Sequence, residues 1–86
     1  MKRKTERTRL KNRVIKLIVE RHPDTYIAYP LGIVGACVSQ GDTYEEALAE
    51  VKVMLKELVD IYGEELFDDN ENPVMEAFVE EAVMSV

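Results

Sequence analysis

The stretch GDTYEEALAEVKVMLKELVDIYG, residues 41–63, decides the fold because it predicts one amphipathic helix with a marked beginning and end. Thr43 and Glu46 fit a capping box, in which the threonine hydroxyl accepts from a first-turn amide and the glutamate reaches back to the Thr43 amide. Gly63 can take the left-handed conformation that ends many helices. Eight apolar residues recur at steps of three and four and share one helix face: Tyr44, Ala47, Leu48, Val51, Leu55, Leu58, Val59 and Tyr62. We expect this face to pack on a core rather than to bind a cofactor or a membrane.

Two short strands are expected before the helix, joined by a turn. Residues 13–21, RVIKLIVER, place Ile15, Leu17 and Val19 on one wholly apolar face, which is expected to contact the helix. The opposite face mixes apolar and charged residues. The sequence HPD then favours a turn, and residues 25–29 predict a second strand antiparallel to the first.

A third strand is expected at residues 36–40, after the irregular apolar connection PLGIVG at residues 30–35. The glycines of that connection suggest positive φ or a close approach of the backbone. Cys37 falls within the strand and is expected to be a small buried residue rather than a reactive thiolate. Three strands followed by one helix predict an α+β domain, in which the helix packs on one face of an antiparallel sheet.

Length and composition bound the class of protein. The chain has 86 residues, enough for one small domain, and its one cysteine excludes an intramolecular disulfide framework. A small domain without disulfides points to a reducing compartment, or to stabilisation by oligomerisation. No apolar run is long enough to span a bilayer, and the basic N-terminus lacks the apolar core of a secretory signal. We therefore expect a cytoplasmic protein.

Charge is divided unevenly along the chain. Residues 1–21 carry nine Lys and Arg against two Glu, a net charge of +7, whereas the remainder carries two Lys against 15 acidic residues, a net charge of −13. Residues 1–12 are expected to form a mobile arm. Six basic residues of the arm are candidates for contacts with nucleic-acid phosphates: Lys2, Arg3, Lys4, Arg7, Arg9 and Lys11. A solubilising arm without a ligand explains the same composition.

No residue pattern indicates catalysis, a metal or a cofactor. His22 is the only histidine and is expected to be an exposed turn residue, since no nucleophile or metal partner accompanies it. The acidic run at residues 68–71 lacks the glycine and the distal glutamate of a calcium loop. We expect no catalytic, cofactor-binding or metal-ligating residues, and hence a protein that is not an enzyme.

Two strings of sequence stand out in combination: YIAY at residues 26–29 and GACVSQGDTYEEAL at residues 35–48. Together they resemble the HicB-like antitoxin family, in its short single-domain form, and the resemblance extends over about residues 13–62. Seven positions match the family motif, and we expect them to be structural: Gly35, Cys37, Gly41, Asp42, Thr43, Glu46 and Ala47. The loop at residues 30–37 departs from the family's usual Pro-x-Leu-Pro-Gly-Cys pattern.

The resemblance implies a β-β-β-α-β fold, a truncated relative of the ribonuclease H fold without its active site. The family's last element is a strand, which would fall at about residues 79–85, a region whose own pattern fits helix or strand. The resemblance also implies an antitoxin that binds and neutralises a HicA-like RNA-cleaving toxin. Because 23 residues follow Gly63 in this sequence, we do not expect the DNA-binding domain that longer members append. The expected organisation is thus a basic arm at residues 1–12 and one domain at residues 13–86.

A three-stranded sheet with one helix leaves one sheet face open, so partners are expected. Besides the toxin, a homodimer or higher oligomer is the default, because an edge strand can pair across a two-fold axis. Five residues are candidates for the partner surface: Tyr26, Tyr29, Leu31, Ile33 and Val34. Two alternatives stay open, a nucleic-acid-binding regulator that uses the basic arm and an oligomeric domain without a toxin.

Overall fold

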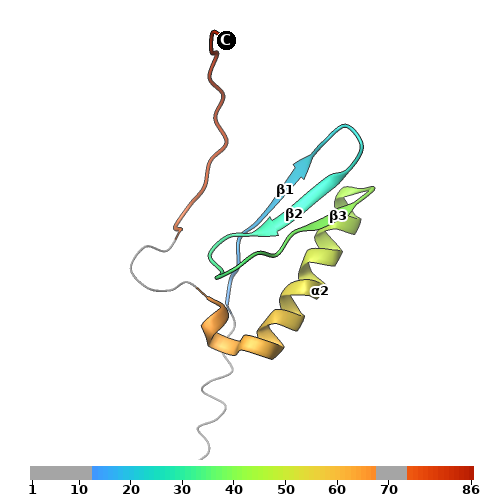
Figure 1. Cartoon of the computed structure of the whole chain (residues 1–86), viewed down its shortest axis with the longest axis vertical. Coiled ribbons are helices and arrows are strands. Elements are labelled where there is room, and N and C mark those ends of the chain that lie inside the picture. The colour runs from blue at the N-terminus through green and yellow to red at the C-terminus, as the bar shows by residue number, and fades with distance from the viewer. Residues whose placement is uncertain (1–12, 68–73) are drawn as a thin grey trace, which may run out of the picture.

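The computed structural model describes residues 13–67 and 74–86. Five elements follow one another along the chain: β1 (Leu17–Arg21), β2 (Tyr26–Pro30), β3 (Ser39–Gly41), α2 (Tyr44–Tyr62) and the 3-10 helix η1 (Gly63–Leu66). The three strands form one antiparallel sheet, and α2 lies across one face of it (Figure 1). The predicted α+β class, with a helix on one face of an antiparallel sheet, is confirmed.

The sheet is a meander with β2 in the middle. β1 and β2 pair from Leu17 opposite Pro30 to Arg21 opposite Tyr26, and His22 N donates to Thr25 O at 2.8 Å in the turn between them. β3 pairs with β2 over three residues, Ser39–Gly41, so the predicted range 36–40 is wrong at both ends. Cys37 precedes the strand rather than lying within it, and Gly41, predicted as a turn residue, is its last residue. Pro30 has no N–H to donate, which limits pairing at that end of β2.

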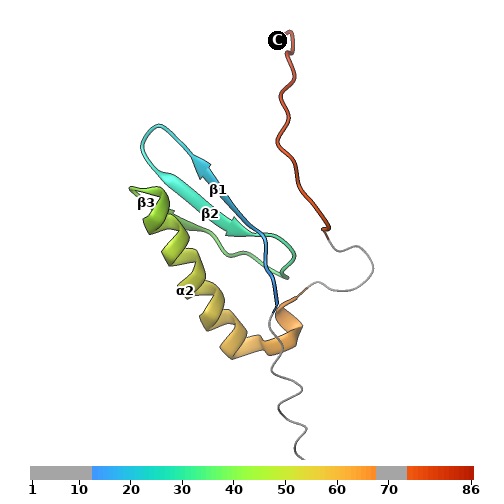
Figure 2. The same cartoon turned by 180° about the vertical axis from the view of Figure 1, so that it is seen from behind.

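The core lies between the sheet and α2. Six apolar residues are buried there: Ala28, Cys37, Ala47, Val51, Leu55 and Leu66. Ile15, Leu17 and Val19 pack against this cluster, as predicted for the inner face of residues 13–21. The strand itself is shorter than that range: β1 begins at Leu17, and Ile15 packs on the core from the chain that precedes it. The view from behind shows the same layer order, with no helix on the other sheet face in the described part of the chain (Figure 2).

The apolar stripe of α2 is longer than the core that covers it. Tyr44, Val59 and Tyr62 were predicted to face the core, yet all three are exposed. The reason is geometric: at 1.5 Å per residue the 19 residues of α2 span about 28 Å, whereas a five-residue strand spans only about 17 Å. In Figure 1 the last turns of α2 accordingly extend beyond the sheet, whereas Tyr44 is exposed at the first position of the helix.

The beginning and end of α2 follow the sequence with one difference. Thr43 Oγ1 accepts from Glu46 N at 3.1 Å, as predicted, but the Glu46 carboxylate accepts from Asp42 N at 2.9 Å rather than from the Thr43 amide. Glu46 thus satisfies the amide one residue earlier, outside the first turn. Gly63 ends the helix at φ 59°, and its N–H donates to Val59 O.

The segment 74–86 is where the structure departs most from the sequence prediction. The strand expected at about residues 79–85 is absent: residues 74–86 contain no helix and no strand, and all of them are exposed. Within the described residues the order is thus β-β-β-α followed by η1. In Figure 1 this segment runs away from the sheet and helix toward the end marked C.

Candidate functional site

The first candidate surface is the outer face of the sheet, which α2 does not cover. Side chains alternate along a strand, so Ile18 and Glu20 on β1 and Ile27 and Tyr29 on β2 point away from the core-facing Val19 and its neighbours. These four residues are half-buried. The face is therefore partly apolar, with a polar cluster at one place.

That polar cluster joins Glu20, His22 and Tyr29. His22 Nε2 lies 2.9 Å from Glu20 Oε1, and the Tyr29 hydroxyl donates to Glu20 Oε2 at 2.7 Å. The hydrogen bond with His22, followed by that from Tyr29, holds the pKa of the Glu20 carboxyl below its ordinary value. The bond to Glu20 also raises the pKa of Tyr29. His22 is exposed, as expected, but it belongs to this cluster.

The cluster gives a testable pH dependence. Because the folded-state pKa of Glu20 is lowered, its stabilising contribution is present above the unfolded pKa and is lost as pH falls through the folded pKa. Tyr29→Phe removes one donor, so we expect the Glu20 pKa to move up toward its ordinary value, and His22→Ala to move it further. An NMR titration of the Glu20 side-chain carboxyl carbon measures both shifts. Tyr44→Phe serves as the control, because Tyr44 is not one of the groups that shift the pKa of Glu20. An unchanged Glu20 pKa in both test variants would contradict the contacts of Glu20 with His22 and Tyr29.

The second candidate surface is the loop at residues 31–36, which is held against η1. Ile33 forms an isolated bridge with Phe67, and Val34 N donates to Leu66 O at 2.8 Å. Gly32 and Gly35 have φ of 83° and 95°, conformations that favour glycine. The loop thus turns away from β2 at one glycine and back toward β3 at the other, with Val34 presented between them.

An open pocket of about 340 Å³ lies beside that loop. Val34, Gly35, Leu58, Tyr62, Glu65 and Leu66 line it. Val34 is 61% exposed and Tyr62 is 54% exposed, whereas Leu66 is buried at its base. An open hollow of mixed apolar and polar lining, with an aromatic side chain and a carboxylate, is suited to a protruding basic or aromatic side chain of another protein.

The structure divides the five predicted partner residues among different places. Tyr26 and Ile33 pack against the core cluster. Tyr29 lies on the outer sheet face, and Leu31 lines a second pocket with Ile18 and Phe78. Only Val34 lies at the pocket beside α2.

Sequence reasoning missed Leu58, Tyr62 and Glu65 as lining residues of the first pocket. The length of the helix relative to the strands was the signal that could have found Tyr62. A 19-residue helix must extend beyond a short sheet, so an aromatic residue in its last turn is a candidate for exposure.

The motif residues have structural roles. An added Cβ at Gly41 would lie 2.6 Å from Ala47 N, so glycine permits the close approach of β3 to α2. Cys37 is buried, and desolvation raises the pKa of its thiol, which disfavours the reactive thiolate. Ser39, which the sequence analysis did not single out, is buried and donates from Oγ to Ala47 O at 2.7 Å. This bond links β3 to the first turns of the helix.

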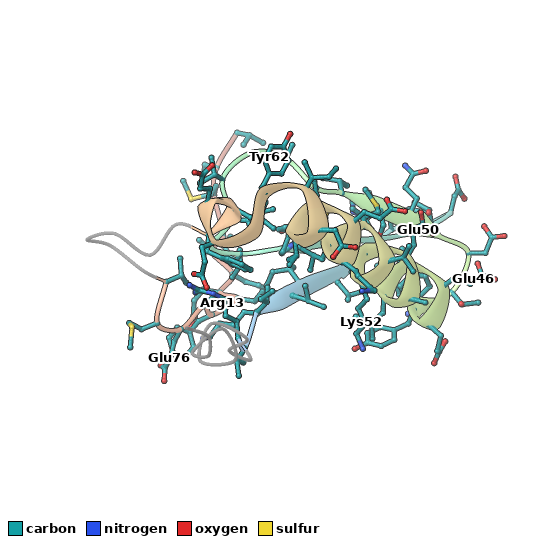
Figure 3. The ribbon with its side chains drawn as sticks, turned by 90° about the horizontal axis from the view of Figure 1, so that it is seen from below. Arg13, Glu46, Glu50, Lys52, Tyr62 and Glu76 are labelled. Carbon is teal, nitrogen blue, oxygen red and sulfur yellow. The ribbon has the colours of Figure 1, made fainter. Side chains whose placement is uncertain are left out.

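The surface of α2 and η1 is acidic. Residues 44–66 carry seven carboxylates and two lysines, a net charge of −5: Glu45, Glu46, Glu50, Glu57, Asp60, Glu64 and Glu65, with Lys52 and Lys56. Figure 3 shows Glu46 and Glu50 near the beginning of α2 and Tyr62 at its other end. Glu64 is engaged by Arg13, whose guanidinium lies 2.5 Å from Glu64 Oε1 and 4.3 Å from the centre of the Phe67 ring.

Two predicted sites lie outside the described residues: the six basic residues Lys2 to Lys11 and the acidic run at residues 68–71. Residues 13–67 and 74–86 contain no group of three potential metal ligands, and none of their helices is long and apolar enough to cross a membrane. Comparison of the chain with family models, curated proteins and solved structures gives no match. The HicB-like resemblance therefore stays a prediction from the residues quoted for it.

Proposed function

We propose that this chain is a HicB-like antitoxin, which binds a HicA-like RNA-cleaving toxin and covers its active or RNA-binding surface. The observation that carries the proposal is the pairing of an acidic helix with an open pocket of mixed lining at its end. The pocket is lined by Val34 and Tyr62, and the helical region beside it carries a net charge of −5. The motif resemblance in residues 26–48 supplies the class of partner.

The physical basis is charge complementarity with a protein that binds RNA. An RNA-binding surface must be basic to contact phosphates. An acidic surface attracts it and speeds association, while buried apolar contacts at the centre supply affinity. Tyr62, which lines the pocket together with Leu58 and Glu65, is suited to such a central contact. A protein acting in this way needs no catalytic residue of its own, and it works in the cytoplasm, where the toxin meets RNA.

The two exposed tyrosines of α2 give a matched test. Tyr62 is 54% exposed and lines the pocket, whereas Tyr44 is 48% exposed at the other end of the helix. We expect Tyr62→Ala to weaken toxin binding at least about tenfold, since an aromatic residue that fills an interface contributes about 1.4 kcal/mol or more. Tyr44→Ala should leave binding within about twofold.

The reading frames next to this gene are first searched for a small HicA-like toxin. Calorimetry then measures binding to its catalytically inactive variant, and co-expression with the active toxin measures growth rescue. Circular dichroism of both variants controls for folding. The proposal fails if the chain neither binds the toxin nor restores growth. Equal losses from Tyr62→Ala and Tyr44→Ala would leave the antitoxin role standing but would remove the pocket as its binding surface.

A further inference from the structure

The segment 74–86 exposes more large apolar side chains than the domain buries in its core cluster. Seven are exposed: Val74, Met75, Phe78, Val79, Val83, Met84 and Val86. The core cluster has six members, two of them alanine and one cysteine. Large apolar side chains exposed in such number within 13 residues favour an interaction site. Neither the toxin contact proposed above nor the core accounts for this segment.

The edge of the sheet at β1 offers a complementary surface. Among the described residues β1 has one hydrogen-bonded neighbour, β2. Lys16 O accepts from Leu31 N at 2.9 Å, so the alternation of an antiparallel ladder directs the backbone groups of Leu17, Val19 and Arg21 away from β2. A row of backbone donors and acceptors at an edge is a template for another strand.

The segment has the properties of a strand that fits this edge. It is already extended, and residues 74–86 contain no glycine or proline. Phe78, Ala82 and Met84 alternate with Val79 and Val83, so either face of an added strand would be partly apolar. An added strand would bring Glu76, Glu80 and Glu81, on its two faces, beside an edge strand that has Lys16 and Arg21 at its two ends.

The segment also begins beside β1. Glu76, Ala77 and Phe78 line an open pocket together with Leu17, Ile18 and Leu31 of the sheet. Beyond this point the segment departs from its own sheet and helix, as both views show (Figures 1 and 2). Its own chain therefore leaves residues 79–86 without a neighbour in the described structure, and leaves the edge of β1 open.

We propose that residues 74–86 of one copy pair with the β1 edge of a second copy, and that the exchange is reciprocal. A two-fold axis gives each edge one added strand and covers both apolar segments, which closes the assembly as a dimer. Each sheet gains a fourth strand, next to β1, that its own chain does not supply. The outer half of the pocket at Phe78 becomes the crossing point of the two chains.

Two adjacent proline substitutions test the pairing. In an added strand, alternate residues direct their N–H groups toward β1, so only one of Ala82→Pro and Val83→Pro removes a pairing donor. The full-length chain is measured by light scattering after size exclusion, over a dilution series, with hydrogen exchange of residues 79–86 at each concentration. We expect a dimer whose dissociation constant rises at least about tenfold in one proline variant and clearly less in the other. Protection of residues 79–86 should disappear on dilution.

Three results would overturn the exchange. The first is a monomeric wild-type chain, even if its residues 79–86 are protected from hydrogen exchange by pairing with the sheet of the same chain. The second is a dimer whose dissociation constant neither proline substitution raises. The third is a dissociation constant that both substitutions raise equally. Ala82→Ser is the matched control, since it keeps the backbone N–H. Toxin binding is not part of this measurement, so the exchange and the antitoxin role stand or fall separately.

Discussion

Replacing Gly41 with alanine is expected to lower the free energy of unfolding by about 3 kcal/mol, the upper end of the usual cost of overpacking. The added Cβ would lie 2.6 Å from Ala47 N, 2.8 Å from Glu46 Cβ and 3.0 Å from Glu46 C. Two of these atoms belong to the backbone of the first turn of α2, where the Thr43–Glu46 and Asp42–Glu46 hydrogen bonds hold the chain. The clash therefore cannot be relieved by rotating a side chain.

Gly32→Ala is the matched control for Gly41→Ala. Gly32 has φ of 83° and nothing within 4 Å of the position that a Cβ would take, so alanine there meets conformational strain but no clash, at a cost of about 1 kcal/mol. Gly41 is the reverse case, with φ outside the left-handed region and no space. Backbone conformation alone predicts that alanine at Gly32 lowers stability more. Packing predicts that alanine at Gly41 lowers it more.

Thermal and urea unfolding of both variants at one protein concentration decide between these rankings. For a domain of this size, a loss of 1 kcal/mol lowers Tm by about 4–8 °C. A loss of about 3 kcal/mol in Gly41→Ala should therefore lower Tm by about 12–24 °C. A Gly41→Ala protein as stable as Gly32→Ala would mean that β3 can move away from α2. The close approach of strand and helix would then not explain the glycine of the QGDT sequence.

The helix and the inner face of β1 could be predicted because their information is local. The periodicity of residues 44–62 and the Thr43 and Gly63 signals are confirmed by α2 and its two ends. The alternation of Ile15, Leu17 and Val19 is confirmed by their packing on the core. In each case the pattern repeats often enough along the chain that one face must be apolar whatever the partner.

The candidate surfaces could not be predicted in the same way, because tertiary contacts create them. Val34 and Tyr62 line one pocket because the Val34 N–H donates to Leu66 O, 32 residues later in the chain. Glu20 and Tyr29 are nine residues apart, and the register of β1 and β2 brings them together. The pattern of residues 79–85 fits a strand, but a strand needs a hydrogen-bonding neighbour, and sequence alone does not say whether that neighbour lies in the same chain.

The second large effect concerns two valines of α2, Val51 and Val53. Substitution by alanine is expected to lower the free energy of unfolding at Val51 and to raise it at Val53. Val51 is fully buried in the core cluster, whereas Val53 is 55% exposed on the same helix. Val51→Ala removes apolar groups worth about 0.8 kcal/mol each and leaves a cavity, so we expect a loss of about 2 kcal/mol after the gain in helix propensity. Val53→Ala keeps only the propensity gain, about 0.5 kcal/mol.

Urea unfolding of the two alanine variants at equal protein concentration measures the difference, because any oligomer makes apparent stability depend on concentration. Equal losses would show that the Val53 face of α2 is buried in solution, which a second chain covering that face would produce. A higher free energy of unfolding for Val53→Ala would show that the outer side of α2 is uncovered in the isolated protein. A toxin of the proposed kind would then have access to that side of the helix, and the proposed exchange of residues 74–86 at the β1 edge would not compete with it.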